Sequence, residues 1–92
     1  MKSKKRDRLE VIYDILNIIN EHHNSIKPTR LLRCANLSSK GFAEYFDELK
    51  EKGFIKEVTN SDEKRYITLT DKGFAFLQKY KVIMDFIDEF NL

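Results

Sequence analysis

The stretch YITLTDKGFAFL, residues 66–77, constrains the fold more than any other part of this sequence. Its first half alternates between polar and apolar residues, which is typical of a half-buried strand, whereas its second half repeats like a helix. Thr70 is a good helix N-cap, and Asp71 suits the positive end of a helix dipole. The chain therefore passes from a strand directly into a last helix, which we expect to run to about Phe90.

A β-hairpin is predicted just before this junction. FIKEVTN, residues 54–60, and KRYITLT, residues 64–70, read as two strands joined by a polar, turn-like linker. Gly73 then falls in the first turn of the last helix, where glycine costs about 1 kcal/mol relative to alanine. We expect close packing of Gly73 against a neighbouring backbone to compensate.

Three helices are predicted before the hairpin. They run from Asp7 to about His23, from Pro28 to about Cys34, and from Ser38 or Ser39 to about Lys52. Proline favours a first helical turn, serine is a good cap, and Gly53 suits the position just after a helix end. The fold class is mainly α with a β-hairpin (α+β), in a single domain over residues 1–92.

Composition and motifs exclude several classes of protein. No apolar run approaches the ~20 residues of a membrane span, and the basic start lacks the apolar core of a signal peptide, so we expect a cytoplasmic protein without a membrane partner. No phosphate loop, nucleophile motif or metal-ligand spacing occurs. We therefore expect no enzyme, metal, cofactor or small-molecule ligand. The lone Cys34 is expected to be buried, with a redox role as the alternative.

Charge is unevenly distributed, although the net charge is only +2. Residues 22–43 contain no acidic residue, and the first eight residues are strongly basic. The basic residues of the acid-free window are Lys27, Arg30, Arg33 and Lys40. The second half of the third predicted helix reverses the sign with Glu44, Asp47, Glu48 and Glu51.

GFIKEV…KRYITLTDKGFAFL resembles the wing and last helix of winged helix-turn-helix transcription regulators. LLRCANLSSKGFAEYFDELKEKGFI resembles the helix-turn-helix of small archaeal winged-helix proteins, found in archaeal chromosomes and in their viruses, that dimerise through a C-terminal coiled-coil helix. The resemblance covers about Leu9 to Tyr80. It implies a basic arm over residues 1–8, a winged-helix core over residues 9–70 and a dimerisation helix over residues 71–92.

In this family the third helix lies in the DNA major groove, and the wing touches backbone or minor groove. Carried onto this sequence, the resemblance implies contacts with double-stranded DNA from Thr29, Arg30, Arg33, Ser38, Ser39, Lys40, Ala43, Lys64 and Arg65. The arm from Lys2 to Arg8 can follow flanking phosphates. Because the second half of the third helix is acidic, we infer that only its first two turns enter the groove.

The last helix carries a heptad seam, since its apolar residues step by three and four. A single small domain cannot cover so long a seam, which predicts a homodimer. The interface residues expected are Phe76, Tyr80, Ile83, Met84, Ile87 and Phe90. The alternative is a monomer whose last helix folds back on its own core.

These expectations combine into a dimeric, sequence-specific DNA-binding regulator of transcription, either a repressor or an activator. Two alternatives stay open. An architectural chromatin-type protein would bind DNA with little sequence preference, and the modest net charge argues against it. A winged-helix protein-interaction module would bind no DNA, and the acidic half of the third helix favours it.

Overall fold

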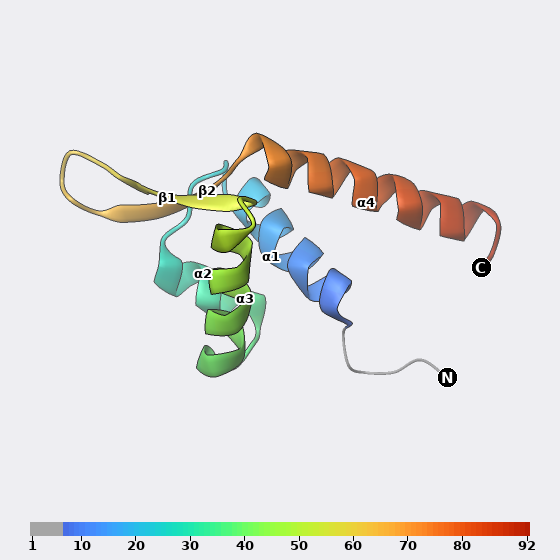
Figure 1. The fold of residues 1–92 in the computed structure, drawn as a ribbon, viewed down its shortest axis with the longest axis horizontal. Helices are drawn as coiled ribbons and strands as arrows, with labels where there is room; N and C mark the ends of the chain where they lie inside the picture. Colours follow the sequence, from blue (N-terminus) through green and yellow to red (C-terminus); the bar gives the residue numbers. More distant parts are fainter. Residues whose placement is uncertain (1–6) are drawn as a thin grey trace.

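The computed structural model describes residues 7–92. The elements follow one another as α1 (Arg8–Glu21), α2 (Pro28–Ala35), α3 (Ser39–Glu51), β1 (Ile55–Thr59), β2 (Arg65–Leu69) and α4 (Asp71–Glu89). The predicted order and the mainly helical, winged-helix class are confirmed, with bounds that differ by one or two residues (Figure 1). Residues 1–6 of the predicted basic arm lie outside the described residues, and Arg8 is the first residue of α1.

Local sequence explains where the helices begin. Asp7 caps α1 by accepting from the Glu10 N–H at 2.8 Å, and the Glu10 carboxylate accepts from the Asp7 N–H at 3.2 Å, which forms a capping box. Ser38 and Thr70 cap α3 and α4 in the same way, each accepting from the N–H three residues on. α2 has no side-chain cap and begins instead with Pro28.

A backbone contact that was not predicted from the sequence joins the antiparallel hairpin to the loop before α2. Ile55 lies opposite Leu69 in the hairpin register. Ile26, in the loop before α2, donates to the carbonyl oxygen of Ile67 at 3.2 Å and accepts from its N–H at 2.8 Å. The Asn24 carboxamide oxygen accepts from the Leu69 N–H at 2.7 Å. These bonds hold the start of α2 beside the wing strand β2.

The hydrophobic core lies between α1, α2, α3 and the hairpin. α1 contacts α2, β2 and α4, which explains its broad apolar stripe. The buried side chains are Val11, Ile12, Ile15, Leu16, Ile19, Ile26, Leu31, Ala35, Phe42, Leu49, Ile55, Ile67, Leu69 and Leu77.

Gly73 lies where α4 crosses the turn that follows α3. A Cβ atom at this position would collide with the carbonyl oxygen of Phe54. The predicted close packing against a neighbouring backbone is therefore confirmed. The missing side chain allows α4 to begin in contact with the body of the domain.

Cys34 is exposed, so the expectation of a buried cysteine is wrong. α2 is short and buries one narrow line of side chains, Leu31 and Ala35. Position 34 falls outside that line, because only side chains on the core-facing side of a helix are covered.

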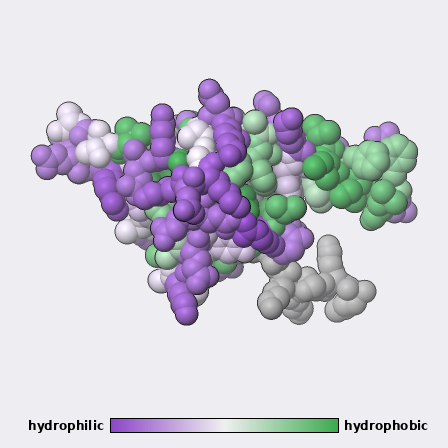
Figure 2. Space-filling model, in the orientation of Figure 1, coloured by the Kyte–Doolittle hydropathy of each residue, from purple (hydrophilic) through white to green (hydrophobic). Residues whose placement is uncertain are grey.

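Among residues 7–92, α4 contacts the body over its first half only. Leu77 is buried, and Tyr80 stacks on Tyr13 of α1 with ring centroids 4.5 Å apart. Beyond Tyr80 the helix projects from the body (Figure 1), and Figure 2 shows apolar surface over this projecting end. None of the helices within residues 7–92 combines the length and the apolar composition that a membrane span requires.

Candidate nucleic-acid interface

The residues predicted to contact DNA come from α2, from the start of α3 and from the wing, which is the β1–β2 hairpin. All of them are exposed. Thr29, Arg30 and Arg33 belong to α2, whereas Lys64 and Arg65 lie at the start of β2. Ser38 is the cap of α3, and the remaining predicted residues occupy its first two turns.

The structure brings the start of α2 against the wing. Residues 27–29 and residues 63–65 line a shallow hollow of about 480 Å³. This juxtaposition follows from the backbone bridge between Ile26 and Ile67. Lys27 was not among the predicted site residues, although its place just before Pro28 within the acid-free window was a usable signal.

Two of the predicted residues already have partners within the chain. The Ser38 hydroxyl accepts from the Gly41 N–H at 3.0 Å, which leaves its own hydrogen available to donate. Arg30 Nε donates to His22 Nε2 at 3.3 Å. His22 Nδ1 lies 2.9 Å from the Ile18 carbonyl oxygen, which can only accept, so Nδ1 carries the proton and Nε2 is the acceptor.

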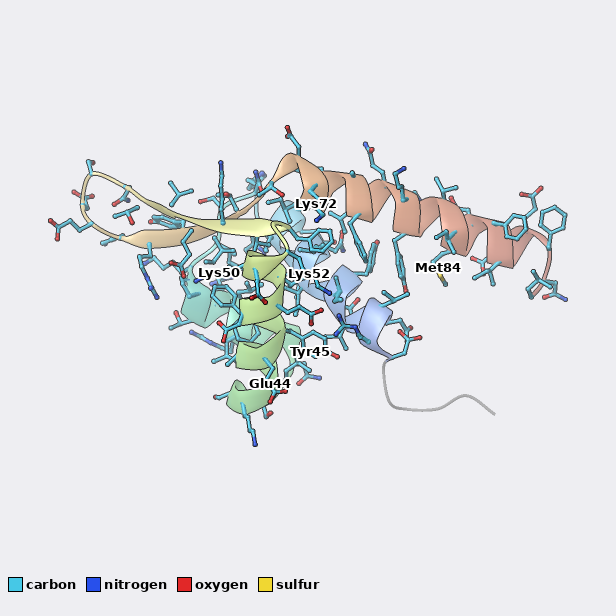
Figure 3. The ribbon with its side chains drawn as sticks, in the orientation of Figure 1. Glu44, Tyr45, Lys50, Lys52, Lys72 and Met84 are labelled. Atoms are coloured by element: carbon cyan, nitrogen blue, oxygen red, sulfur yellow. The ribbon has the colours of Figure 1, made fainter. Side chains whose placement is uncertain are left out.

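The wing is connected to α3 through one carboxylate. Glu57 on β1 lies 3.8 Å from Arg65 Nη1 and 3.6 Å from Lys50 Nζ of α3. Exposed ion pairs of this kind contribute little stability. They do show which side of α3 borders the wing, namely the side that carries Lys50. Figure 3 shows Lys50 on that side and Lys52 on the opposite one.

The other side of α3 faces the start of α1. Glu48 accepts from the Arg8 guanidinium and from Lys52 Nζ, the latter at 2.8 Å. These hydrogen bonds lower the pKa of Glu48 to about 2, and the bond from Arg8 has the largest effect. Glu44 and Tyr45 line a small hollow together with the same arginine and glutamate (Figure 3). Arg8, predicted as part of a DNA-binding arm, is thus bound to α3.

The predicted dimer seam divides into a covered part and an exposed part. Phe76 packs edge-on against Phe54 with centroids 5.5 Å apart, and Tyr80 is half-buried on α1. Ile83, Met84 and Phe90 are 56%, 37% and 57% exposed. Between the two parts lies an apolar hollow of about 230 Å³, lined by Leu9, Phe76, Lys79, Tyr80 and Ile83.

A comparison with protein families identifies the architecture that holds these surfaces. The family described as "Winged helix-turn-helix" matches residues 5–88. The chain belongs to the winged helix-turn-helix family. Its relatives include the uncharacterized protein MJ0287 of Methanocaldococcus jannaschii, 42% identical over 71 residues that make up 71% of each chain. The protein MJ0290 of the same organism is 30% identical over 95% of this chain, which spans only 38% of that relative.

Solved structures of winged helix-turn-helix proteins share the fold. Sso10a-2, a DNA-binding protein from Sulfolobus solfataricus, superposes with a TM-score of 0.72 at 19% identity, over 94% of this chain and 86% of that one. MepR, a transcription regulator of the Staphylococcus aureus multidrug efflux pump MepA, gives 0.75 at 14% identity over 86% and 59%. A mutant MarR from E. coli complexed with operator DNA gives 0.63 at 21% identity over 74% and 49%. At these identities the likeness is one of fold alone.

Proposed function

We propose that this chain is a dimeric, sequence-specific DNA-binding regulator of transcription. The observation that carries the proposal is the arrangement of exposed cations and hydroxyls. The cations and hydroxyls at the start of α2 and on the wing line one hollow. The start of α3 follows α2 directly in the chain. The Glu48 carboxylate is bound instead by Arg8 of α1, and Glu44 lines the hollow beside this pair. Family members with this fold include DNA-binding proteins, which supports the same role here.

In this proposal the start of α3 enters the major groove. Lys40 and the Ser39 hydroxyl reach base edges or phosphates there, since lysine and serine both serve in such contacts. Arg33 on α2 and Lys64 on the wing bind phosphates on either side. Phosphate contacts of this kind position the protein, while base contacts select the sequence.

The decisive experiment removes charge from the proposed interface. The double variant Lys40→Ala, Arg33→Ala should lose most of its affinity for a preferred duplex while it keeps its fold and its oligomeric state. The matched control, Lys72→Ala, Lys81→Ala, removes the same charge from α4 and should bind normally. Fluorescence anisotropy at one fixed salt concentration measures both. Retained affinity in the first variant would place the interface elsewhere.

We also propose that the dimer forms through the outer half of α4. A second copy of the chain suits this surface, because apolar side chains at heptad spacing pack best against a matching seam. The exposed side chains that this pairing would cover include Ile83, Met84, Phe86 and Phe90.

Charge along α4 favours an antiparallel pair. Lys79 and Lys81 lie toward the body, whereas Asp88 and Glu89 lie toward the free end. In a parallel pair the two acidic ends would lie at the same level, which is unfavourable, whereas an antiparallel pair places the acidic end of one copy level with the lysines of the other.

Heptad spacing allows several antiparallel registers, and we propose the one that covers the outer half of α4 from Tyr80 to Phe90. Tyr80 then meets the partner's Phe90, and Ile83 meets the partner's Ile87. The two-fold axis falls near residue 85, where Phe86 lies beside its own copy. Phe76 lies outside this paired stretch, in keeping with its packing against Phe54 of the same chain.

A salt titration on random duplex DNA separates the proposed regulator from the two alternatives. An architectural protein binds all duplexes alike and loses affinity steeply with salt. A regulator binds one site more tightly than random DNA by several kcal/mol. A protein-interaction module binds neither.

A further inference from the structure

Asp47 differs from Glu48 of α3 and from Glu57 of the wing. Glu48 is held by Arg8 and Lys52, and Glu57 lies between Lys50 and Arg65. Asp47 is exposed and has no ion-pair or hydrogen-bond partner within residues 7–92.

Helical geometry places Asp47 on the stripe of α3 that would face DNA. Lys40, Ala43 and Asp47 are spaced i, i+3 and i+7, so they line one face of the helix, and all three are exposed. Lys50, three residues after Asp47, contacts Glu57 of β1, so this face of α3 borders the wing. At 1.5 Å per residue the stripe spans about 10 Å, which is about three base pairs at 3.4 Å each.

A carboxylate at this point prefers cytosine among the groups of the major groove. Phosphates repel it, and guanine presents only acceptors. Adenine has a donor at N6 but an acceptor beside it at N7, whereas the N4 amino group of cytosine is a donor that aspartate accepts from. The stripe therefore offers a cation at one end, a methyl group in the middle and an acceptor at the other end. Such a series has a direction and distinguishes one base sequence from its reverse.

We propose that Asp47 determines sequence specificity by accepting a hydrogen bond from the N4 amino group of a cytosine, about two to three base pairs from the contact of Lys40. This inference rests on the proposed function. It extends base contact to the third turn of α3, beyond the first two turns inferred from the sequence. Ala43, between the two charged residues, then lies where it can contact a thymine methyl group.

The alternative effect of Asp47 is simple repulsion of phosphates, and the two effects differ in their sequence dependence. Repulsion lowers affinity for all duplexes by the same factor. Base recognition lowers affinity only for duplexes that lack cytosine at one position.

The test compares Asp47→Ala with Glu51→Ala, which removes the same charge one turn further from the start of α3. A preferred site is first selected from a random pool with the wild-type chain. Relative affinities are then measured for all single base-pair changes in that site. Circular dichroism and thermal melting confirm that both variants keep the wild-type fold.

For Asp47→Ala we expect discrimination at one C·G pair to fall by roughly 5- to 100-fold, with the other positions unchanged. Glu51→Ala should keep the wild-type preferences throughout. Equal gains of affinity on all duplexes, or an unchanged profile, would overturn the role of Asp47 while the proposed function stands. A wild-type chain that selects no site would overturn both.

Discussion

The two halves of α4 share one apolar repeat but have different surroundings. In the inner half, Gly73 meets the Phe54 carbonyl group and Leu77 is only 8% exposed. In the outer half, Ile83 is 56% exposed. Heptad spacing therefore indicates that a helix face is to be covered, but not whether the cover comes from the same chain. Here α1 covers the first half, and we propose that a second copy covers the other.

The largest expected effect is on the free energy of unfolding, and it distinguishes side chains needed for folding from those needed only for association. Leu77→Ala should lower the free energy of unfolding by about 2–5 kcal/mol, because it leaves a cavity in a packed core. Ile83→Ala should change it by less than about 1 kcal/mol at concentrations where the chain is monomeric, because that side chain is mostly exposed. Urea denaturation of the dilute protein measures both. Equal losses would show that the outer half also belongs to the monomer core.

Association should fail when charge enters the outer seam. Ile83→Asp combined with Ile87→Asp should weaken dimerisation at least 100-fold, because two carboxylates per chain would be buried in an apolar interface. Sedimentation measures the mass, and circular dichroism confirms that the helices remain. Val82→Asp is the matched control, since Val82 is 66% exposed and lies off the seam. A dimer that survives the double change would exclude this interface.

The antiparallel register can be examined by cross-linking. In a Cys34→Ser background, which removes the exposed native thiol, Phe86→Cys should link two chains with a short bis-maleimide. Residue 86 lies beside its own copy in the proposed pair, whereas Val82→Cys points away and should link poorly. The reverse yields would disprove the register without disproving the dimer.

The smallest expected effect concerns the ion pair between Arg8 and Glu48, which fixes the helix on which the inner half of α4 packs. α4 rests on α1, and the start of α1 is held to α3 by Arg8 and Glu48. Because the pKa of Glu48 is lowered to about 2 in the folded chain, its contribution to stability is present above its ordinary pKa near 4.3 and disappears as the pH falls toward 2.

Thermal melting of wild type and Glu48→Gln reveals this contribution. The melting temperature of the wild type should drop further between pH 5 and pH 2 than that of the variant. The difference is expected to be small, because both partners are partly exposed. Glu44→Gln serves as the control and should follow the wild type. Identical profiles for wild type and Glu48→Gln would show that the pair adds nothing to stability.

Local signals account for what could be predicted from the sequence. The caps at Ser38 and Thr70 act within three residues of their partners, and the periods of helix and strand are visible in the residues themselves. The surface position of the candidate DNA-contact residues followed from the same periods. Their role in DNA binding remains a prediction.

Contacts between distant segments account for what could not be predicted. The bridge of Ile26 to Ile67, and the hold of Arg8 on Glu48 across 40 residues, have no local signature. Cys34 was misplaced for a related reason, because the narrow covered side of α2 depends on how closely its neighbours approach.

The sequence by itself determined the order of the elements and the need for cover along α4, because both depend on local backbone preferences and on the spacing of apolar side chains. Only the tertiary structure decided where that cover stops and which carboxylates of α3 already have cationic partners. Those outcomes depend on distances between segments far apart in the chain, and such distances are established only when the core has packed.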